Sequence, residues 1–264
     1  MALPLNTHTN QYVFGRGRIF IGVYSGDANR ADRRFIGNCP GFTLSVESEK
    51  FEHFSSTAGI QTKDLTVTKS VNFNAQVTCD DIQPENLAMF LGGTSGTLSQ
   101  SATPVTNEAI VVQKGYHYQI GLVGSNDVGV REVSSVAVTN VAGSTTYVLD
   151  TDYKLDADSG MIYIISGGAI TNGQTIHVDY TPAAGSRTLV ESGTGGAIDA
   201  ELFFVADNAN GDDRDLRIPL CSIAPSGELP FITADELSSM TFDIGISTKD
   251  TSTPQIIIAG QDVA

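Results

Sequence analysis

Hydrophobic and polar residues alternate without interruption in residues 70–78, which read SVNFNAQVT. Side chains of a strand point alternately to its two faces, so this pattern predicts a half-buried β-strand. One face holds the apolar residues Val71, Phe73, Ala75 and Val77, and the other holds Asn72, Asn74, Gln76 and Thr78. The second face is polar but carries no Lys or Glu, which raises the question of what it faces.

Three further stretches show the same period. FTLSVES (residues 42–48) places Phe42, Leu44 and Val46 on one face. SSMTFDIGIS sets Met240, Phe242, Ile244 and Ile246 against Ser239, Thr241, Asp243 and Ser247. A predicted hairpin with its tip at NANGDD has one strand face made of Asp199, Glu201, Phe203, Val205 and Asp207. These patterns predict a mainly β protein.

The start of the chain is less regular. Residues 1–11 are predicted to form a flexible arm, residues 12–24 a first strand, and residues 25–34 a loop. Residues 47–64 have no clean period, although they contain bulky apolar groups, and we expect a long loop there.

One helix is predicted over residues 81–91. Asp80 or Asp81 would form its N-cap, Pro84 and Glu85 would lie in its first turn, and Gly92 would follow its end. Leu87, Phe90 and Leu91 have the i, i+3, i+4 spacing of a core-facing stripe.

Two Gly/Ser/Thr-rich stretches, residues 92–104 and 183–196, flank a strand-rich block and are predicted to be linkers. The expected organisation is therefore a core made of residues 1–100 and 191–264, with an inserted β module at residues 101–190.

Charge is unevenly distributed along the chain, whose net charge is -15. Residues 1–69 hold eight Lys or Arg and six acids, whereas residues 70–264 hold seven and twenty-four. An acidic surface repels phosphates, so the composition argues against a general nucleic-acid binder but suits a passage that must not hold DNA.

Signals for catalysis are missing. The histidines (His8, His53, His117 and His177) are scattered, and there is no G-x-S-x-G motif. GRGR at residues 15–18 lacks the remainder of a phosphate-binding loop. We expect no enzyme activity and no cofactor.

Cysteine usage and hydropathy bear on the compartment. Cys39, Cys79 and Cys221 are far apart in sequence and suggest neither a disulfide framework nor a zinc site. The sequence also lacks a signal-peptide pattern and an 18-residue apolar run. The expectation is a protein of a reducing compartment that neither spans a membrane nor is secreted through a signal peptide.

The best candidate for metal binding is DTDYKLDADSG, which contains Asp150, Asp152, Asp156 and Asp158. Calcium prefers carboxylate oxygens, but the EF-hand spacing and its terminal Glu are missing. Asp and Gly are also the usual residues of hairpin turns, and structural turns are the favoured interpretation.

The order of segments resembles that of the major tail tube proteins of long-tailed (siphophage-type) bacteriophages. The resemblance is carried by YVFGRGRIFIGVY, by RRFIGNCPGFTLSVESEKFEHFSSTAGIQTKD and by VNFNAQVTCDDIQPENLAMFLGG. It resumes in AELFFVADNANGDDRDLRIPLCSIAPSGELPFI and MTFDIGIS. The block between them, with YVLDTDYKLDADSGMIYII and IHVDYTPAAG, is similar to modules of phage tail components.

The resemblance implies a β-sandwich or barrel-like subunit with one flanking helix. Six subunits would form a ring whose strands join into a continuous β-barrel around a lumen, and rings would stack into the tail tube that conducts DNA into the host. The implied partners are further copies of the chain, the tape measure, terminator and distal tail ring proteins, and double-stranded DNA that passes without specific binding. The implied location is the virion tail, and the host cytoplasm during assembly.

Two hypotheses about sites follow. A lumen lining must be wet without gripping phosphates, which assigns to it Asn72, Asn74, Gln76, Thr78, Ser239, Thr241 and Asp243. In the resembling family the long early loop contacts the neighbouring ring, which assigns that role to Glu47, Glu49, Phe51, His53, Phe54, Ile60, Lys63 and Asp64. We also expect Arg30, Arg33 and Arg34 to pair with acidic segments across subunits, and the inserted module to lie outside the tube.

Other classes of function stay open at this point. One is a calcium-binding adhesion module or a carbohydrate-binding β module, which would use Asp150 to Asp158. Another is a different tail ring component, such as a terminator or baseplate ring, which would not stack. A hydrolase is the third and has the least support.

Overall fold

The structure is a computed structural model that describes residues 12–27, 30–57, 59–124, 126–193 and 197–260. It confirms that the protein is mainly β, with several antiparallel sheets. The chain divides into two compact units, one made of Met1–Ser95 with Val190–Ala264 and one made of Gly96–Leu189. The predicted flexible arm, residues 1–11, lies outside the described residues.

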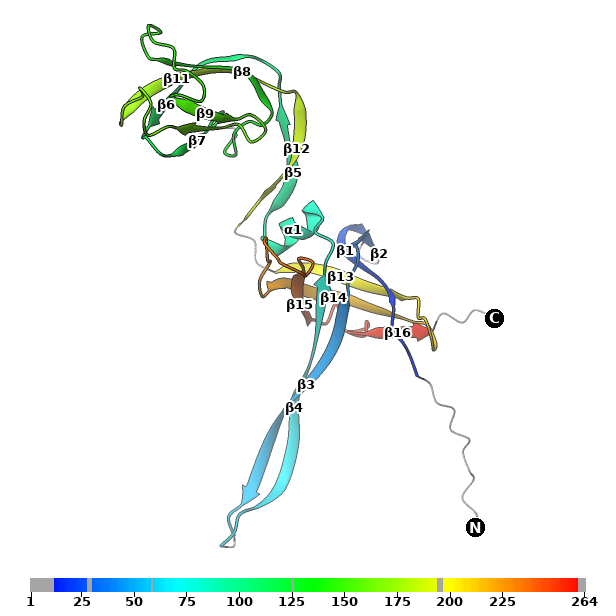
Figure 1. Cartoon of the computed structure of the whole chain (residues 1–264). Coiled ribbons are helices and arrows are strands. Elements are labelled where there is room, and N and C mark those ends of the chain that lie inside the picture. The colour runs from blue at the N-terminus through cyan, green and yellow to red at the C-terminus, as the bar shows by residue number, and fades with distance from the viewer. Residues whose placement is uncertain (1–11, 28–29, 58, 125, 194–196, 261–264) are drawn as a thin grey trace. The chain divides into compact units, whose positions relative to one another are not determined.

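The first unit is built on an antiparallel sheet with the strand order β2-β1-β13-β14-β15-β4-β3, in which β16 also pairs with β14 (Figure 1). The strands are β1 (Gly17–Asp27), β2 (Arg30–Phe35), β3 (Gly41–Ser55), β4 (Thr62–Cys79), β13 (Ile198–Ala206), β14 (Arg214–Ser226), β15 (Met240–Ile246) and β16 (Ile257–Gly260). The predicted loop over residues 25–34 is wrong, because most of it forms the end of β1 and the edge strand β2.

The core of this unit lies on one face of the sheet, where the alternating apolar residues gather. Ala75 and Val77 of β4 are buried there beside Met240, Phe242 and Ile244 of β15. Directly opposite residues of antiparallel strands point to the same face, so the pairing of Ile244 with Ala75 aligns the two apolar rows. The other face of these strands is therefore polar as a consequence of the same register.

Helix α1 (Pro84–Phe90) begins later than predicted. Its N-cap is Gln83, which makes no side-chain cap hydrogen bond. Asp80 and Asp81 instead accept side-chain amide hydrogen bonds from Asn38 and Gln83, each at 2.8 Å. The helix ends at Phe90, one residue before the predicted end, Leu91 is its C-cap, and Gly92 follows with a φ of 59°.

The buried face of α1 also differs from the predicted stripe. Leu87 and Phe90 do pack on the core, but Leu91 is exposed. The most buried residue of the helix is Asn86, whose amide donates to the carbonyl oxygens of Ile36 at 2.8 Å and Asp81 at 2.9 Å. A polar residue at a core position breaks the apolar pattern that the prediction relied on.

Strands β3 and β4 pair from Gly41 and Thr78 out to Ser55 and Thr62, and their far part extends beyond the rest of the sheet (Figure 1). We call residues 47–70 the hairpin arm. The prediction of a loop over residues 47–64 is therefore wrong. The register shifts twice, between Glu49 and Lys50 and again between His53 and Phe54. Each bulge moves the following side chains to the opposite face, which removes the period from the sequence.

The second unit is a small sandwich of two three-stranded sheets, ordered β6-β11-β8 and β7-β10-β9. Its strands are β6 (Val105–Val112), β7 (His117–Gln119), β8 (Val133–Asn140), β9 (Tyr153–Asp156), β10 (Met161–Ile164) and β11 (Gln174–Pro182). Both sheets contribute buried residues to one apolar cluster, including Ile162 and Ile176. The inserted module was predicted over residues 101–190, and the second unit comprises Gly96–Leu189.

The two predicted linkers contain strands. β5 (Thr94–Gln100) and β12 (Gly185–Glu191) pair with each other in a separate two-stranded sheet. Their Gly, Ser and Thr residues resemble a flexible linker in composition, but backbone hydrogen bonds across the pair do not depend on side chains.

Within the described residues, no helix is both long enough and apolar enough to cross a membrane.

Candidate functional site

The residues assigned to the lumen by sequence lie mostly together, on the sheet face opposite the core. Thr78 pairs with Thr241, and Gln76 pairs with Asp243. The hydroxyl oxygens of Thr78 and Thr241 are 3.3 Å apart, and the Gln76 amide donates to the Asp243 carboxylate at 2.8 Å. Asn72 and Asn74 continue the row along β4, while Ser239 precedes β15 and belongs to the loop before it.

This polar face extends over two more strands than predicted. Thr43 and Ser45 of β3 pair with Gln76 and Asn74, and on the other side Ser222 of β14 pairs with Gly245. Together the four strands line an open hollow of about 620 Å³. The polar positions that alternate with the apolar ones in FTLSVES and in β14 would have identified Thr43, Ser45 and Ser222.

The charge of the hollow is negative. Glu47 and Asp243 line it, and among the described residues no Lys or Arg does. Every other polar side chain that lines it is uncharged. The surface can therefore hydrogen-bond water but offers no favourable ion pair to a phosphate.

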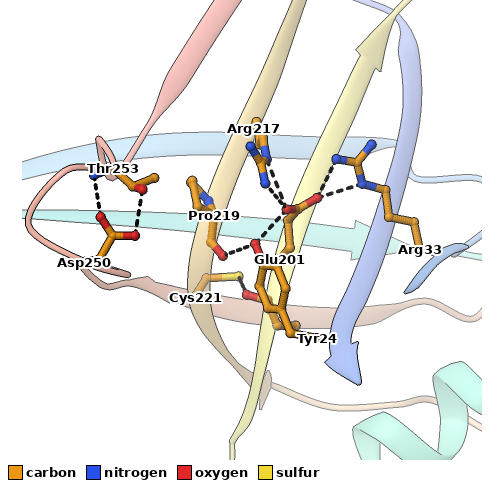
Figure 2. Close-up of polar contacts among 9 residues, drawn as sticks. Tyr24, Arg33, Glu201, Arg217, Pro219, Cys221, Asp250 and Thr253 are labelled. Atoms are coloured by element: carbon orange, nitrogen blue, oxygen red, sulfur yellow. Dashed lines mark hydrogen bonds and ion pairs between the residues drawn. The ribbon is translucent and has the colours of Figure 1, made fainter. Parts of the chain in front are cut away.

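A second polar cluster on the same sheet face was not predicted (Figure 2). The side chain of Glu201 on β13 is 0% exposed. Its carboxylate accepts hydrogen bonds from Arg33 Nε at 2.7 Å, from Arg217 Nη2 at 2.7 Å and from the Tyr24 hydroxyl at 2.7 Å. That hydroxyl also lies 2.8 Å from the Pro219 carbonyl oxygen. Strands β1, β2, β13 and β14 are thus joined at one carboxylate.

The cluster fixes the charge of Glu201. Burial alone would raise the pKa of its carboxyl, but the hydrogen bonds from Arg217, Tyr24 and Arg33 outweigh burial and lower that pKa. The carboxylate is therefore ionised, and its charge is offset by two guanidinium groups. Within its own chain Arg33 pairs with Glu201.

The hairpin arm carries all eight residues that the sequence assigned to contacts with a neighbouring ring. Several polar side chains pair within the arm: Lys63 lies 2.8 Å from Glu52, and His53 Nδ1 lies 2.6 Å from an oxygen of Asp64. The large apolar side chains of the arm are exposed: Phe51, Phe54 and Ile60, which the sequence assigned to the contact, and Leu65 and Val67, which it did not. Val46 and Val71 flank the arm and are exposed as well, although their alternation had placed them on apolar strand faces.

The calcium candidates are not gathered into one site. Asp152 is buried, and its two oxygens accept backbone N–H hydrogen bonds from Val148 at 2.8 Å and Ala169 at 2.7 Å. These bonds, from Ala169 and then Val148, lower the pKa of Asp152. Asp156 accepts from the backbone of Ser159. Across the described ranges no three His, Cys, Asp or Glu side chains group as a metal site.

We therefore expect calcium to leave the melting temperature of the protein unchanged, because the oxygens of Asp152 are already used in turns. The measurement is thermal melting with calcium and with magnesium as the matched control. A calcium-specific rise that Asp150→Asn removes would contradict this interpretation.

The three thiols are free. Cys79 and Cys221 are buried and donate to the backbone oxygens of Ile36 at 3.2 Å and Ala200 at 3.3 Å. Burial raises the pKa of Cys221 to about 12, which leaves its thiol protonated at neutral pH. The burial and backbone hydrogen bonds of Cys79 and Cys221 are typical of cysteines that pack in a core.

Comparisons with known proteins give one match. The comparison with curated proteins finds no similar protein. One family model matches residues 12–256, a range that includes nearly all of the described chain and both of its units. The chain therefore belongs to the family described as Protein of unknown function UCP028589.

Proposed function

We propose that the protein is a structural component of a phage tail, whose copies form hexameric rings that stack into the tube through which DNA passes. The observation that carries the proposal is the polar sheet face, where described residues of four adjacent strands line a hollow without Lys or Arg. The two guanidinium groups on the neighbouring strands of this face, those of Arg33 and Arg217, are both paired with Glu201. A conduit for DNA needs a hydrated wall that presents no cations to bind the phosphates. The proposed role includes no catalysis.

The ends of the sheet support closure into a ring. β2 and β3 stand at the two ends of the strand order. Exposed strand edges invite pairing with other chains, and a barrel formed by several copies removes them. Edge-to-edge joining would carry the polar face around a shared bore and leave the core clusters outside it.

The hairpin arm supports contact between rings. Its apolar side chains have no core to cover, and exposed apolar groups gathered on one element are typical of protein interfaces. Docking on the neighbouring ring would bury them. The second unit would then lie on the outside of the tube, because the bore must stay open.

The direct test is negative-stain electron microscopy of the purified protein over a concentration series, with size-exclusion chromatography beside it. We expect hollow stacked rings, or tubes that lengthen as the concentration rises. Single rings that never stack would favour a terminator or baseplate component instead. Solid aggregates or fibres without a bore would contradict the proposal.

A charge substitution tests the lining. We expect Asn74→Lys combined with Gln76→Lys to make the assembled protein retain duplex DNA at low salt, because the hollow would gain two cations per copy. Fluorescence anisotropy of a labelled duplex measures the retention, and added salt should reverse it. The control is Thr106→Lys with Thr146→Lys, two exposed residues of the second unit. Equal DNA retention by both double variants would remove the lumen assignment.

A further inference from the structure

The loop at residues 227–239, between β14 and β15, exposes three large apolar side chains. Phe231 is 83% exposed, Ile232 is 95% exposed and Leu237 is 79% exposed. The Ser238 hydroxyl donates to the Pro230 carbonyl oxygen at 2.6 Å, which ties the two ends of the exposed segment together. We call this segment the apolar loop. Such a display of apolar surface marks an interaction site.

The same unit contains a partly open pocket of about 630 Å³ on the core side of the sheet. Strands that are not neighbours in the sheet line it, with Phe42 and Leu44 from β3, Phe204 from β13 and Ile258 from β16. The rings of Phe42 and Phe204 lie 5.6 Å apart, which shows that the sheet curls until β3 faces β13. The volume is in the range of pockets that hold several side chains.

The apolar loop and the pocket carry charges of opposite sign. The apolar loop contains Glu228, Asp235 and Glu236 and no Lys or Arg. The pocket is lined by Arg16 and Arg214 and by no acid. Arg214 also lies 3.2 Å from Asp212 of its own chain, in an exposed pair that a new acidic neighbour could join.

We propose that the apolar loop of one copy inserts into this pocket of a second copy, with its acids beside Arg16 and Arg214. The loop does not fill the pocket of its own chain, because its three apolar side chains are exposed there. Loop and pocket are different surfaces, so copies joined head-to-tail by this contact close into a ring or continue as a filament, whereas two copies that exchange loops form a closed pair. The inference rests on the proposed function in taking the partner to be another copy.

Two one-sided variants test this contact in the full-length protein. The loop variant is Phe231→Ser with Ile232→Ser, and the pocket variant is Leu44→Glu with Ile258→Glu. All four side chains are exposed in the single chain, so folding should survive, which thermal melting checks. The control is Val111→Ser with Val141→Ser, which removes exposed apolar surface from the second unit.

Sedimentation velocity over a concentration series gives the readout. Each one-sided variant should associate at least about tenfold more weakly than the unchanged protein, because aromatic and aliphatic anchors dominate interface energies. Mixing the two variants should produce a species of two chains, since one intact loop and one intact pocket remain. The control variant should associate like the unchanged protein.

Several results would overturn the contact: a loop variant that associates normally, a mixture that forms no pair, or an unchanged protein that stays monomeric throughout. Failure of this contact can be distinguished from failure of the proposed function. Hollow tubes formed by the loop variant would remove the contact and leave the conduit standing. Pairing in the mixture without any hollow assembly of the unchanged protein would leave the contact and remove the conduit.

Discussion

Removing the outer part of the hairpin arm is expected to abolish stacking while leaving the chain folded. The change deletes residues 50–69 and joins Glu49 to Ser70, which pair across the hairpin, through a two-residue Asn-Gly turn. The deleted part includes Phe51, Phe54 and Ile60, all of them exposed, and no member of the buried core. Electron microscopy should show no tubes at any concentration that gives tubes with the intact chain.

A milder pair of variants separates the apolar surface from the length of the arm. Phe51→Ser with Phe54→Ser keeps the hairpin and should still prevent stacking. Glu52→Gln with Lys63→Gln removes an exposed ion pair of the same segment, and such pairs contribute little. It should leave stacking unchanged. Tubes formed by the deletion variant would show that the arm has no part in assembly.

Glu201→Gln is expected to cost more stability than any other single change of a polar residue discussed above. The substitution keeps the size of the side chain but leaves two guanidinium groups facing a neutral amide at a buried point. Breaking a buried ion pair by neutralising one partner typically costs about 3–5 kcal/mol. Arg33 and Arg217 are 37% and 29% exposed, so water will reduce the loss towards the lower end of that range.

Urea unfolding measures this loss, with Glu228→Gln as the control because Glu228 is exposed. The pKa of Glu201 is lowered in the folded state, so its contribution is complete above the unfolded-state value of about 4.3. The contribution is lost as the pH falls through the lower, folded-state pKa. The stability difference between the two proteins should therefore be constant near neutral pH and shrink in acid. A variant as stable as the unchanged chain would contradict the role given to Glu201.

The strands and their faces were predictable where period and burial coincide. Ala75, Val77, Phe242 and Ile244 alternate with polar residues, and the structure buries all four. The hairpin arm was not predictable as strand, because two bulges interrupt the period and neither face meets a core. The pairing of β5 with β12 was hidden for another reason, since those strands are rich in Gly, Ser and Thr, which also form linkers.

The Glu201 cluster was beyond sequence reasoning. Its members are separated by up to 193 positions along the chain, from Tyr24 to Arg217, and they meet only because β1, β2, β13 and β14 are neighbours in the sheet. The alternation of β13 places Glu201 on one strand face but does not reveal that arginine and tyrosine side chains from adjacent strands bury it. The polar face was easier, because Gln76 and Asp243 each lie in a strand whose own alternation reveals its polar side.

If the polar sheet face lines the bore of a hollow assembly, a cryo-electron microscopy reconstruction of the assembled protein will show it, at a resolution that traces β4 and β15. We expect Asn74, Gln76 and Asp243 to point into the bore, with the core cluster outside them. A reconstruction in which these side chains face the exterior, or pack between copies away from any bore, would contradict it.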